Sequence, residues 1–315
     1  MKTYKYLVSV RLMTYMHEQF ITQAMDSIMM QKTNFNVEVV IGDDFSTDKT
    51  LEILKSYKKK KNIDIKILKR EKGDEYWQKR QKLGRFYNYI NILENCSGKY
   101  IAILDGDDYW TDSLKLQKQV NLIEEHKQAS MCVALNKQFF PDENKYIEDK
   151  MYNGKNKSFV YLEDLHKHYF HTSTYLIRKS SLDFVLKNYV HLIKGDTALR
   201  YLLISQGPHI VLNEYVSVYR ISGKGIWTNL PSIKKDILNY RMHHNFRKYF
   251  MLEQKKVHLN LELIFLKRIY IHYSKQNKFC EALKWKMKYI YFLFFFFPRK
   301  AKTKLNKKFK YILSE

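Results

Sequence analysis

The first 140 residues alternate between two hydrophobic patterns. Short runs rich in apolar residues, typical of strands, occupy residues 6–12, 37–41, 63–68 and 100–104, and the run at 37–41 suits a sheet that is covered on both faces. Between and after these runs, apolar residues recur every three or four positions, as on a helix with one buried face, in residues 20–29, 51–57, 86–93 and 116–123. This alternation predicts an α/β domain on a largely parallel sheet.

The alternation loosens beyond residue 130. Strands are expected at residues 131–135, 173–177, 209–212 and 216–220, with helices at 182–190 and 198–204. After Gly223-Lys224-Gly225 the pattern becomes helical, because Leu259, Leu263, Leu266, Tyr270 and Tyr273 step by four and three. We therefore expect one domain over residues 1–225 and a helical extension over residues 226–315.

Charge is concentrated in that extension. The chain has a net charge of +24, and residues 223–315, with 22 Lys/Arg against 5 Asp/Glu, hold +17 of it. The aromatic segment 283–297 precedes a basic run, which favours an interfacial segment bound to an anionic membrane surface. An ordinary packed helix pair with a solvated basic end is the alternative. A nucleic-acid-binding module would also be basic, but no recognised nucleic-acid motif is present.

Cysteine usage and hydropathy indicate the compartment. The three cysteines are widely spaced and form no CxxC pair, which is typical of a reducing environment and not of a disulfide framework or zinc site. No apolar run reaches the roughly 20 residues of a membrane-spanning helix, and the N-terminus is too polar for a signal peptide. The expected location is the cytoplasm, with peripheral attachment to the inner face of the cytoplasmic membrane.

Three polar clusters each follow a predicted strand. They are Thr14-Tyr15 with His17-Glu18, Asp43-Asp44 with Ser46-Thr47-Asp48, and Asp105-Gly106-Asp107-Asp108. Because ligands of open α/β sheets bind outside the carboxyl ends of the strands, these clusters are expected to meet in one cleft. Adjacent carboxylates repel one another unless a cation neutralises them, and oxygen ligands at this spacing suit Mg²⁺ or Mn²⁺ shared with phosphates. Asx-turns and helix caps are the structural alternative for these aspartates.

Longer segments around these clusters carry a resemblance to a known family. Residues 37–50 (Val-Glu-Val-Val-Ile-Gly-Asp-Asp-Phe-Ser-Thr-Asp-Lys-Thr), 104–110 (Leu-Asp-Gly-Asp-Asp-Tyr-Trp) and 115–119 (Lys-Leu-Gln-Lys-Gln) resemble family 2 glycosyltransferases of the GT-A fold. The similarity is greatest to the bacterial surface-polysaccharide branch and extends over residues 5–228. It implies a Rossmann-like mixed sheet with helices on both faces.

The resemblance also implies roles for the clusters. Asp43 would lie near the uracil or ribose of a UDP-sugar, and Asp105 and Asp107 would form the DxD motif around Gly106, with Asp107 the direct metal ligand. Other residues implied in the nucleotide pocket are Thr14, Tyr15, Glu18 and Asp44. The loop that closes over the diphosphate would carry Tyr219, Arg220, Gly223 and Trp227.

A reaction follows from these residue types. A departing nucleoside diphosphate needs a divalent cation, and the acceptor hydroxyl needs one carboxylate as a base. Residues 195–199 resemble the family segment that holds the base, which makes Asp196 the candidate, with a helix N-cap as its alternative role. Direct displacement inverts the anomeric centre. The expected partners of this hexosyltransferase are a nucleotide-sugar donor and a glycan or lipid-linked glycan acceptor.

Several positions depart from the family pattern or admit another chemistry. Met13-Thr14-Tyr15-Met16 replaces Pro-Thr-Tyr-Asn, Lys82 replaces an Asn, and Ser222 replaces a His, which leaves Arg220 or Lys224 to supply positive charge.

A sugar nucleotidyltransferase would need a glycine-rich loop after the first strand, and residues 13–19 contain no glycine. The spacing of His166, His168 and His171 is compatible with zinc, but packing of His171 near the acceptor site is favoured.

Overall fold

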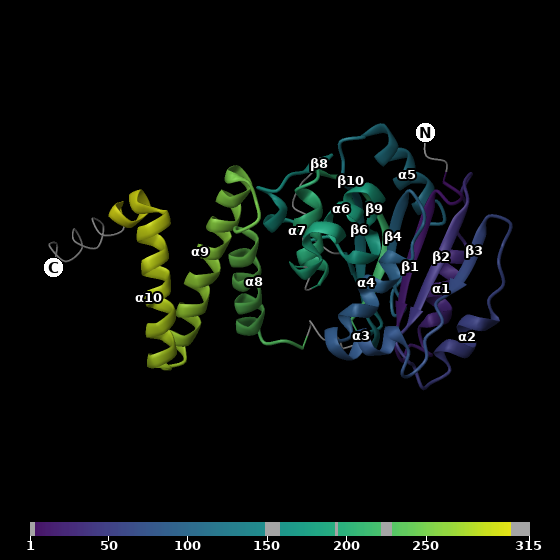
Figure 1. Ribbon diagram of the computed structural model, residues 1–315, viewed down its shortest axis with the longest axis horizontal. Helices are drawn as coiled ribbons and strands as arrows, with labels where there is room; N and C mark the ends of the chain where they lie inside the picture. The colour runs from purple at the N-terminus through teal and green to yellow at the C-terminus, as the bar shows by residue number, and fades with distance from the viewer. Residues whose placement is uncertain (1–3, 149–157, 193–194, 222–228, 304–315) are drawn as a thin grey trace. The chain divides into compact units, whose positions relative to one another are not determined.

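The computed structural model describes residues 4–148, 158–192, 195–221 and 229–303. The chain divides into two compact units, Met1–Ser222 and Gly223–Glu315 (Figure 1). The first unit carries the α/β sheet, and the second is helical.

One mixed sheet organises the first unit. Its strand order is β3-β2-β1-β4-β9-β6-β10-β5, with β7 paired to β6 and β8 paired to β10. The strands are β1 (Val8–Thr14), β2 (Val37–Asp43), β3 (Ile63–Ile67), β4 (Tyr100–Asp105), β5 (Tyr109–Trp110), β6 (Met131–Phe140), β7 (Lys145–Glu148), β8 (Phe159–Val160), β9 (Leu176–Arg178) and β10 (His209–Arg220). The helices are α1 (Ile21–Met29), α2 (Thr50–Ser56), α3 (Glu75–Leu83), α4 (Phe86–Glu94), α5 (Lys115–Glu125), α6 (Lys179–Tyr189) and α7 (Asp196–Ile204).

The order of the parallel strands gives the sheet a switch point at one edge, where open α/β sheets have their ligand crevice. β1 pairs in parallel with both β2 and β4, so the chain runs outward through α1 and α2 to β3 and then returns through α3 and α4 to β4 (Figure 1). Since parallel crossovers are right-handed, this reversal puts α1 and α2 on one face and α4 on the other. Ligands of such sheets bind at the reversal, which here lies between the carboxyl ends of β1 and β4.

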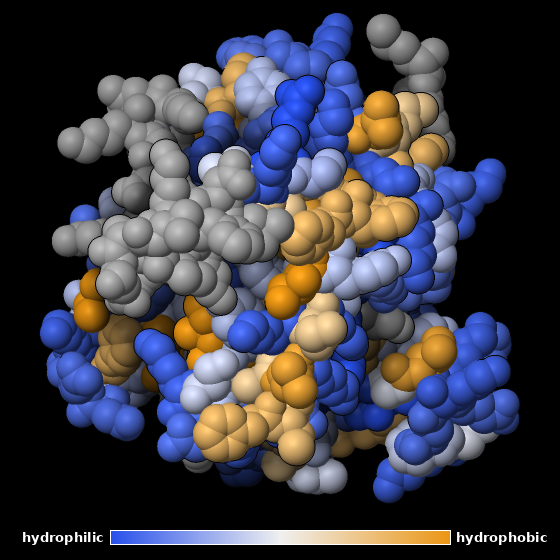
Figure 2. All heavy atoms as spheres, turned by 90° about the vertical axis from the view of Figure 1, so that its left-hand side faces the viewer, coloured by the Kyte–Doolittle hydropathy of each residue, from blue (hydrophilic) through white to orange (hydrophobic). Residues whose placement is uncertain are grey.

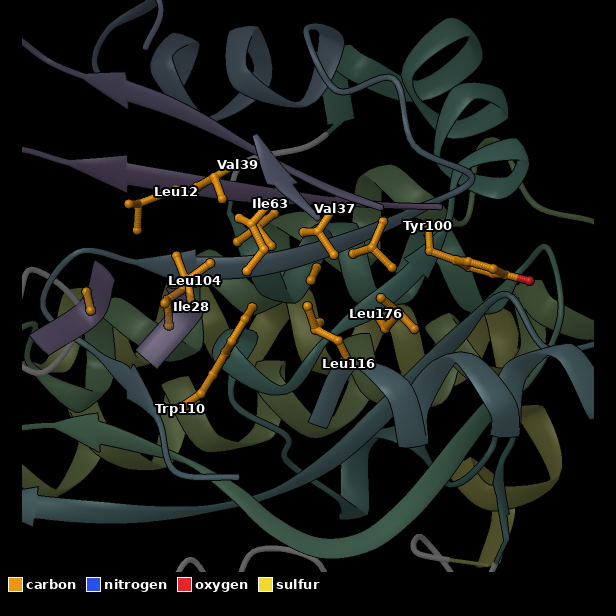
Figure 3. Packing of buried hydrophobic residues seen from close by; sticks show 14 of the residues in the cluster. Leu12, Ile28, Val37, Val39, Ile63, Tyr100, Leu104, Trp110, Leu116 and Leu176 are labelled. Atoms are coloured by element: carbon orange, nitrogen blue, oxygen red, sulfur yellow. The ribbon is translucent and has the colours of Figure 1, made fainter. Parts of the chain in front are cut away.

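Alternation along β1 explains why this buried strand is not wholly apolar. Val8, Val10 and Leu12 belong to the main hydrophobic cluster, which also contains α1 side chains (Figure 3). The intervening Ser9 and Arg11 face the other side of the sheet. There the Arg11 guanidinium lies 4.2 Å from the ring centroid of Tyr89 on α4.

The structure confirms the predicted mixed α/β fold and corrects some element boundaries. β1 covers residues 8–14 and not 6–12, and β9 begins at Leu176 because Thr172–Thr174 forms a 3₁₀ turn in which the Thr174 hydroxyl donates to the carbonyl of His171. The two strands expected at 209–212 and 216–220 are one strand, β10, with irregular register between Leu212 and Ser217. Strands β5, β7 and β8 were not predicted, because two to four residues carry no measurable period.

Three helices form the second unit: α8 (Ser232–Phe246), α9 (Leu252–Lys275) and α10 (Phe279–Phe296). α9 packs against both α8 and α10. The predicted seam on α9 lies against this core, with Leu266 fully inside it. A buried carboxylate, Glu262, is compensated by the Arg247 Nε atom at 2.8 Å and by the His244 Nδ1 atom at 2.7 Å. Among the described helices, none is long and apolar enough to cross a bilayer.

His209 generates a prediction about pH and stability. It is fully buried at the start of β10, both of its ring nitrogens lack a hydrogen-bond partner within the described residues, and burial, with the Arg200 charge, lowers its pKa to about 3. Below pH 6.5 the unfolded chain binds a proton at this histidine that the folded chain does not bind, so stability falls as the pH falls. At pH 5 this difference is about 2 kcal/mol.

The variant His209→Leu is therefore expected to lose less stability between pH 7.5 and pH 5 than the natural protein does. Urea unfolding of both proteins at the two pH values measures the difference. Equal losses in the two proteins would show that His209 accepts a proton in the folded state.

Candidate active site

The carboxyl ends of three adjacent strands bring the three polar clusters together. The register of β1 aligns Thr14 with Asp43 on β2 and Met13 with Asp105 on β4. Beyond the strand ends, the Asp44 amide donates to the carbonyl of Thr14 at 3.0 Å, and the Gly106 amide donates to that of Met13 at 2.8 Å. The expected convergence of the three clusters at one edge of the sheet is thus confirmed.

Asp105 is neutralised from inside the sheet. Its carboxylate forms an ion pair with the guanidinium of Arg11, which is fully buried two residues before Met13 on β1. The Asp105 side chain nevertheless remains 28% exposed towards the crevice. Sequence reasoning did not assign a role to Arg11, although a charged residue within an apolar strand was the available signal.

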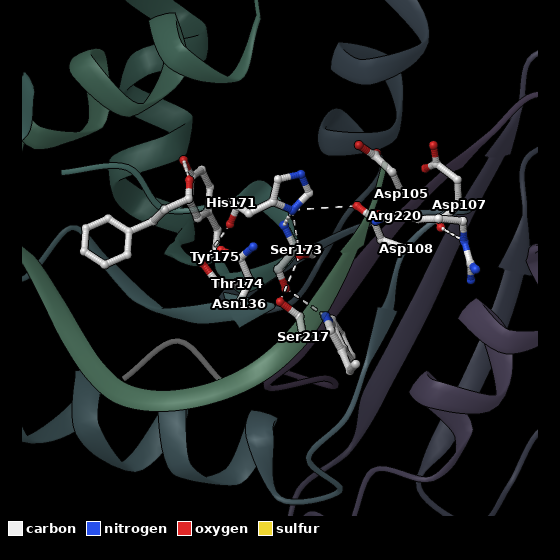
Figure 4. Close-up of polar contacts among 12 residues, drawn as sticks. Asp105, Asp107, Asp108, Asn136, His171, Ser173, Thr174, Tyr175, Ser217 and Arg220 are labelled. Atoms are coloured by element: carbon white, nitrogen blue, oxygen red, sulfur yellow. Dashed lines mark hydrogen bonds and ion pairs between the residues drawn. The ribbon is translucent and has the colours of Figure 1, made fainter. Parts of the chain in front are cut away.

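Asp108 has a structural role. Its Oδ1 atom accepts a hydrogen bond from the Arg220 amide at 2.9 Å, and its Oδ2 atom lies 3.7 Å from the Nδ1 atom of His171 (Figure 4). Burial, followed by the charge of Asp107, raises the pKa of Asp108 well above its ordinary value. This carboxylate therefore ties the end of β10 to the turn after β4.

Asp107 is the most accessible of the three carboxylates. Its side chain is 39% exposed, and its Oδ2 atom lies 4.0 Å from the Nε2 atom of His17. Desolvation raises the pKa of Asp107, the His17 charge opposes this, and the Asp105 charge adds to it. Within the described residues, two buried polar atoms have no hydrogen-bond partner here, Thr14 Oγ1 and His17 Nδ1. These features are typical of a site that binds a cation or a polar ligand.

Gly106 separates Asp105 from Asp107 at a position where a larger residue would crowd its neighbours. A Cβ atom at this position would lie 2.8 Å from His17 Nδ1, 3.0 Å from Ile21 Cδ1 and 3.0 Å from Thr14 Oγ1. The glycine therefore allows the turn after β4 to pack against the loop after β1.

Arg220 places a fixed positive charge beside Asp107. Its Nε atom donates to the Asp107 carbonyl at 2.9 Å, and its Nη2 atom donates to the Gln23 side chain at 2.6 Å. The guanidinium also lies 4.7 Å from the ring centroid of Phe20 and 5.4 Å from that of Tyr109. Contacts from two other elements thus hold the end of β10 against the crevice.

A buried polar network lies around His171 and Ser173, next to Asp108. His171 contacts the Ser173 hydroxyl at 2.8 Å (Figure 4). Its ring also stacks on that of Tyr219 with ring centroids 4.1 Å apart, so the expected packing role of His171 is observed. Burial lowers the pKa of His171 to about 4, which keeps its ring neutral near pH 7. Trp110 donates its indole N–H to the Ser173 carbonyl at 2.8 Å.

The loops after β1 and β2 are fastened to each other. Both carboxylate oxygens of Asp43 accept from Ser46, one from its amide at 2.9 Å and one from its hydroxyl at 2.5 Å, and burial raises the pKa of Asp43. The Ser46 hydroxyl accepts in turn from the Met16 amide at 2.8 Å. Ser46 therefore fastens the two loops to each other, and Asp48 accepts from the Thr50 amide, at the start of α2, at 3.0 Å.

Two residues of these loops, Met16 and Phe45, adopt positive φ angles of 56° and 66°. Side-chain-bearing residues seldom adopt this conformation, and Asn tolerates it better than Met. Position 16 is also the place where the family pattern has Asn. Backbone strain is therefore concentrated in the loops that face the crevice.

Asp44 is occupied by protein partners. Its carboxylate accepts two hydrogen bonds from the Arg80 Nε atom at 3.1 Å and one from the Nη2 atom at 2.9 Å, and it accepts the Tyr76 hydroxyl at 3.0 Å. These contacts attach α3 to the end of β2. Glu18 accepts from the Lys49 amide at 3.1 Å, whereas Tyr15 is 56% exposed at the rim.

Asp196 begins α7, after Gly195 with a φ of 146°. Gly195 occupies the N-cap position, so the alternative role of Asp196 as the N-cap is wrong. Burial raises its pKa, the Thr197 amide and the Arg200 charge oppose the rise, and the Asp105 charge adds to it. The charges of both aspartates also raise the pKa of Tyr219, after its burial. Trp227, Gly223, Lys224 and Ser222 lie outside the described residues.

A mixed α/β sheet with polar side chains at its switch point is typical of nucleotide-binding α/β proteins. Comparison with known families is specific: residues 9–186 match the model of Glycosyl transferase family 2. The chain belongs to this family, which confirms the resemblance seen in the sequence.

Three known proteins illustrate the similarity. An uncharacterised protein of Mycobacterium tuberculosis is 28% identical over 243 residues, which cover 75% of this chain and 65% of that protein. The chain thus spans about two thirds of this relative. The solved structure of Staphylococcus aureus TarS in complex with UDP-GlcNAc has a TM-score of 0.57 at 16% identity and covers 90% of this chain and 91% of that one.

The third is a mannosyltransferase from Pyrobaculum calidifontis, solved in complex with GDP-Man and Mn²⁺. It has a TM-score of 0.60 at 16% identity, over 99% of this chain and 81% of that one. At this identity both structural likenesses establish the fold, which is of the GT-A type as expected.

The crowding at Gly106 predicts the effect of a small substitution. Gly106→Ala is expected to destabilise the protein by about 1–3 kcal/mol, since the added methyl group pushes His17 and Thr14 apart. Adding His17→Ala removes the nearest contact and is expected to restore part of that stability, which urea unfolding of the two variants measures. A Gly106→Ala protein as stable as the natural one would show that the turn relaxes freely.

Proposed function

We propose that this protein transfers a hexose from a UDP-sugar to a hydroxyl group of a glycan or lipid-linked glycan in the synthesis of a cell-surface polysaccharide. The observation that carries this proposal is the convergence of Asp43, Asp105 and Asp107 at the switch point of the sheet. A ligand bound across these strand ends would place its nucleoside near β2 and its phosphates near β4.

The nucleoside would lie against the loops after β1 and β2. Asp43 is oriented by Ser46, and each of its oxygens has a second lone pair for a base N–H or a ribose hydroxyl. Thr14 and Tyr15 would line the same pocket, since no described residue is a hydrogen-bond partner of the Thr14 hydroxyl and Tyr15 lies at the rim. Glu18 and Asp44 would act indirectly, because both hold neighbouring backbone or side chains in place.

The diphosphate would lie beside Asp105 and Asp107. Mg²⁺ or Mn²⁺ held there would neutralise the charge that develops on the leaving diphosphate. The exposed edge of Asp107 suits such an ion, with Asp107 as the direct ligand. Among the described residues no group of three or more metal-ligating side chains is present, and ions of this kind usually bind one or two carboxylates plus substrate phosphates.

Arg220 and Trp227 would complete the diphosphate site. The Arg220 guanidinium is fixed beside Asp107 and offers a positive charge where the family pattern has a His two positions further on. Trp227 is proposed from the family resemblance alone.

Asp196 would be the base that accepts the proton of the acceptor hydroxyl. Its carboxylate is half-buried at the start of α7, and its raised pKa brings it nearer the pH at which a base works best. A single base with direct displacement inverts the anomeric centre. The enzyme would work in the cytoplasm, peripherally attached to the inner face of the membrane that carries a lipid-linked acceptor.

The metal-site proposal predicts a difference between two aspartate variants. Incubation of the natural protein with a panel of UDP-sugars and Mn²⁺ is expected to release UDP, and Asp107→Ala is expected to lower that rate at least about a hundredfold. Asp183→Ala on α6 is the matched control, since this carboxylate is 54% exposed and pairs only locally with Lys179. Equal rates for Asp107→Ala and the natural protein would contradict the metal site.

The base proposal predicts a separation between catalysis and binding. Asp196→Asn is expected to lower kcat by about 10²- to 10⁴-fold while the Kd for UDP with Mn²⁺ stays the same. Because the base works unprotonated, kcat/KM of the natural protein should fall as the pH drops through the raised pKa of Asp196. The kcat/KM of the variant should not show this decrease at low pH. A parallel loss of UDP affinity would instead make Asp196 a donor-binding residue.

A further inference from the structure

Helix α10 has two apolar faces. Its inner face contributes Ala282, Trp285, Tyr289, Phe292 and Leu293, all buried. On the opposite side Phe279, Leu283, Met287, Tyr291 and Phe295 recur every fourth residue, and each is between 57% and 78% exposed. We call these five residues the outer ridge.

The outer ridge is continuous along the helix. A step of four residues turns by only about 40° at 3.6 residues per turn, so the five side chains follow one another in a slow spiral about 24 Å long. Phe294, 48% exposed, widens the ridge at its carboxyl end. Monomeric proteins seldom leave so large an apolar surface in water, which indicates that something covers it.

Lysines border the outer ridge on both sides. Lys286 and Lys288 are exposed and flank Met287, about 100° away in each direction, and Lys284 is exposed between them and the amino end. Arg299 and Lys300 follow the helix, also exposed. Seen from the side of α10, apolar side chains form patches surrounded by hydrophilic ones (Figure 2). The partner must therefore be apolar at its centre and anionic at its rim.

Charge and apolar character distinguish three candidate partners for the outer ridge: a second copy of this chain, a nucleic acid and a bilayer. A second copy of this chain would bring another segment of net charge +17 against the ridge, which opposes close packing. A nucleic acid offers phosphates but no apolar layer to receive Leu283 or Met287. A bilayer with anionic headgroups offers both, because apolar side chains enter the headgroup–acyl boundary while lysines reach the phosphates.

We propose that the outer ridge of α10 docks on a membrane surface rich in anionic headgroups, with the helix axis parallel to that surface. Lys284, Lys286 and Lys288, near the middle of the helix, keep it at the interface. The inference deepens the proposed function, because it identifies the protein surface that would meet a membrane-borne acceptor. It stands on the geometry of α10 and does not depend on any step of catalysis.

The natural cysteines provide a probe for this docking. Cys280 is exposed and lies three residues before Leu283 and seven before Met287, on the same face, whereas Cys96 and Cys132 are buried. A polarity-sensitive dye attached to Cys280 of the full chain is expected to shift to shorter wavelength with vesicles of equal parts phosphatidylglycerol and phosphatidylcholine. Vesicles of pure phosphatidylcholine should bind at least about tenfold more weakly.

Two double variants test whether the ridge itself makes the contact. Leu283→Gln with Tyr291→Gln should lower the affinity for the anionic vesicles at least about tenfold in a sedimentation assay, without unfolding, because both side chains are exposed. Met251→Gln with Leu252→Gln is the matched control, since these residues are 83% and 72% exposed outside α10. The control should bind as the natural protein does.

Three outcomes would overturn the proposal: absence of binding to anionic vesicles, an equal loss in the two double variants, or a natural dimer in light scattering that only the ridge variant breaks. The last result would make the ridge an interface between copies. UDP release with a soluble acceptor should be unchanged in the ridge variant. Loss of vesicle binding with retained UDP release separates this inference from the proposed function, whose failure would remove UDP release alone.

Discussion

The buried ion pair between Arg11 and Asp105 makes the acidic crevice possible. Asp105, Asp107 and Asp108 follow β4 within four residues, and without a counter-charge beneath them their mutual repulsion would oppose the close packing of β1 and β4. A guanidinium is the suitable group for this position, since it stays charged when buried and can also stack on the Tyr89 ring. The cost of burying Arg11 is offset by the partner and the ring that surround it.

The other carboxylates near these strand ends differ in their contacts and in their exposure. Asp108 is anchored by the Arg220 amide, and Asp44 is committed to Arg80 and Tyr76. Asp107 alone among the three aspartates after β4 keeps a largely accessible edge without a strong partner. Of the three aspartates after β4, two are thus held by protein partners, and Asp107 is left accessible for the metal that we propose.

The helical unit follows another physical rule. α10 buries one apolar face against α9 and turns the other outwards between lysines, so the unit is stable without covering all its apolar surface. Its positive charge and its exposed apolar side chains are both complementary to the anionic membrane surface that we propose as its partner. Membrane docking and sugar transfer, as proposed, would be carried by separate residues, so each can be disrupted without the other.

Local signals sufficed for much of the fold and for part of the site. The strands up to β4 and the seam on α9 are long and regular enough to be predicted from periodicity, and the aspartates after β2 and β4 could be assigned to one crevice because parallel strands end at the same edge. Short strands such as β5 could not be predicted, because two residues show no periodicity. The roles of Arg11 and Arg80 as counter-ions could not be predicted either, because their carboxylate partners lie 94 and 36 residues away in the sequence. The sequence by itself determined the fold class, the positions of the acidic clusters and the basic character of the extension. Only the tertiary structure decided which carboxylates are neutralised and which face of α10 stays exposed, because pairing and burial depend on contacts between distant segments.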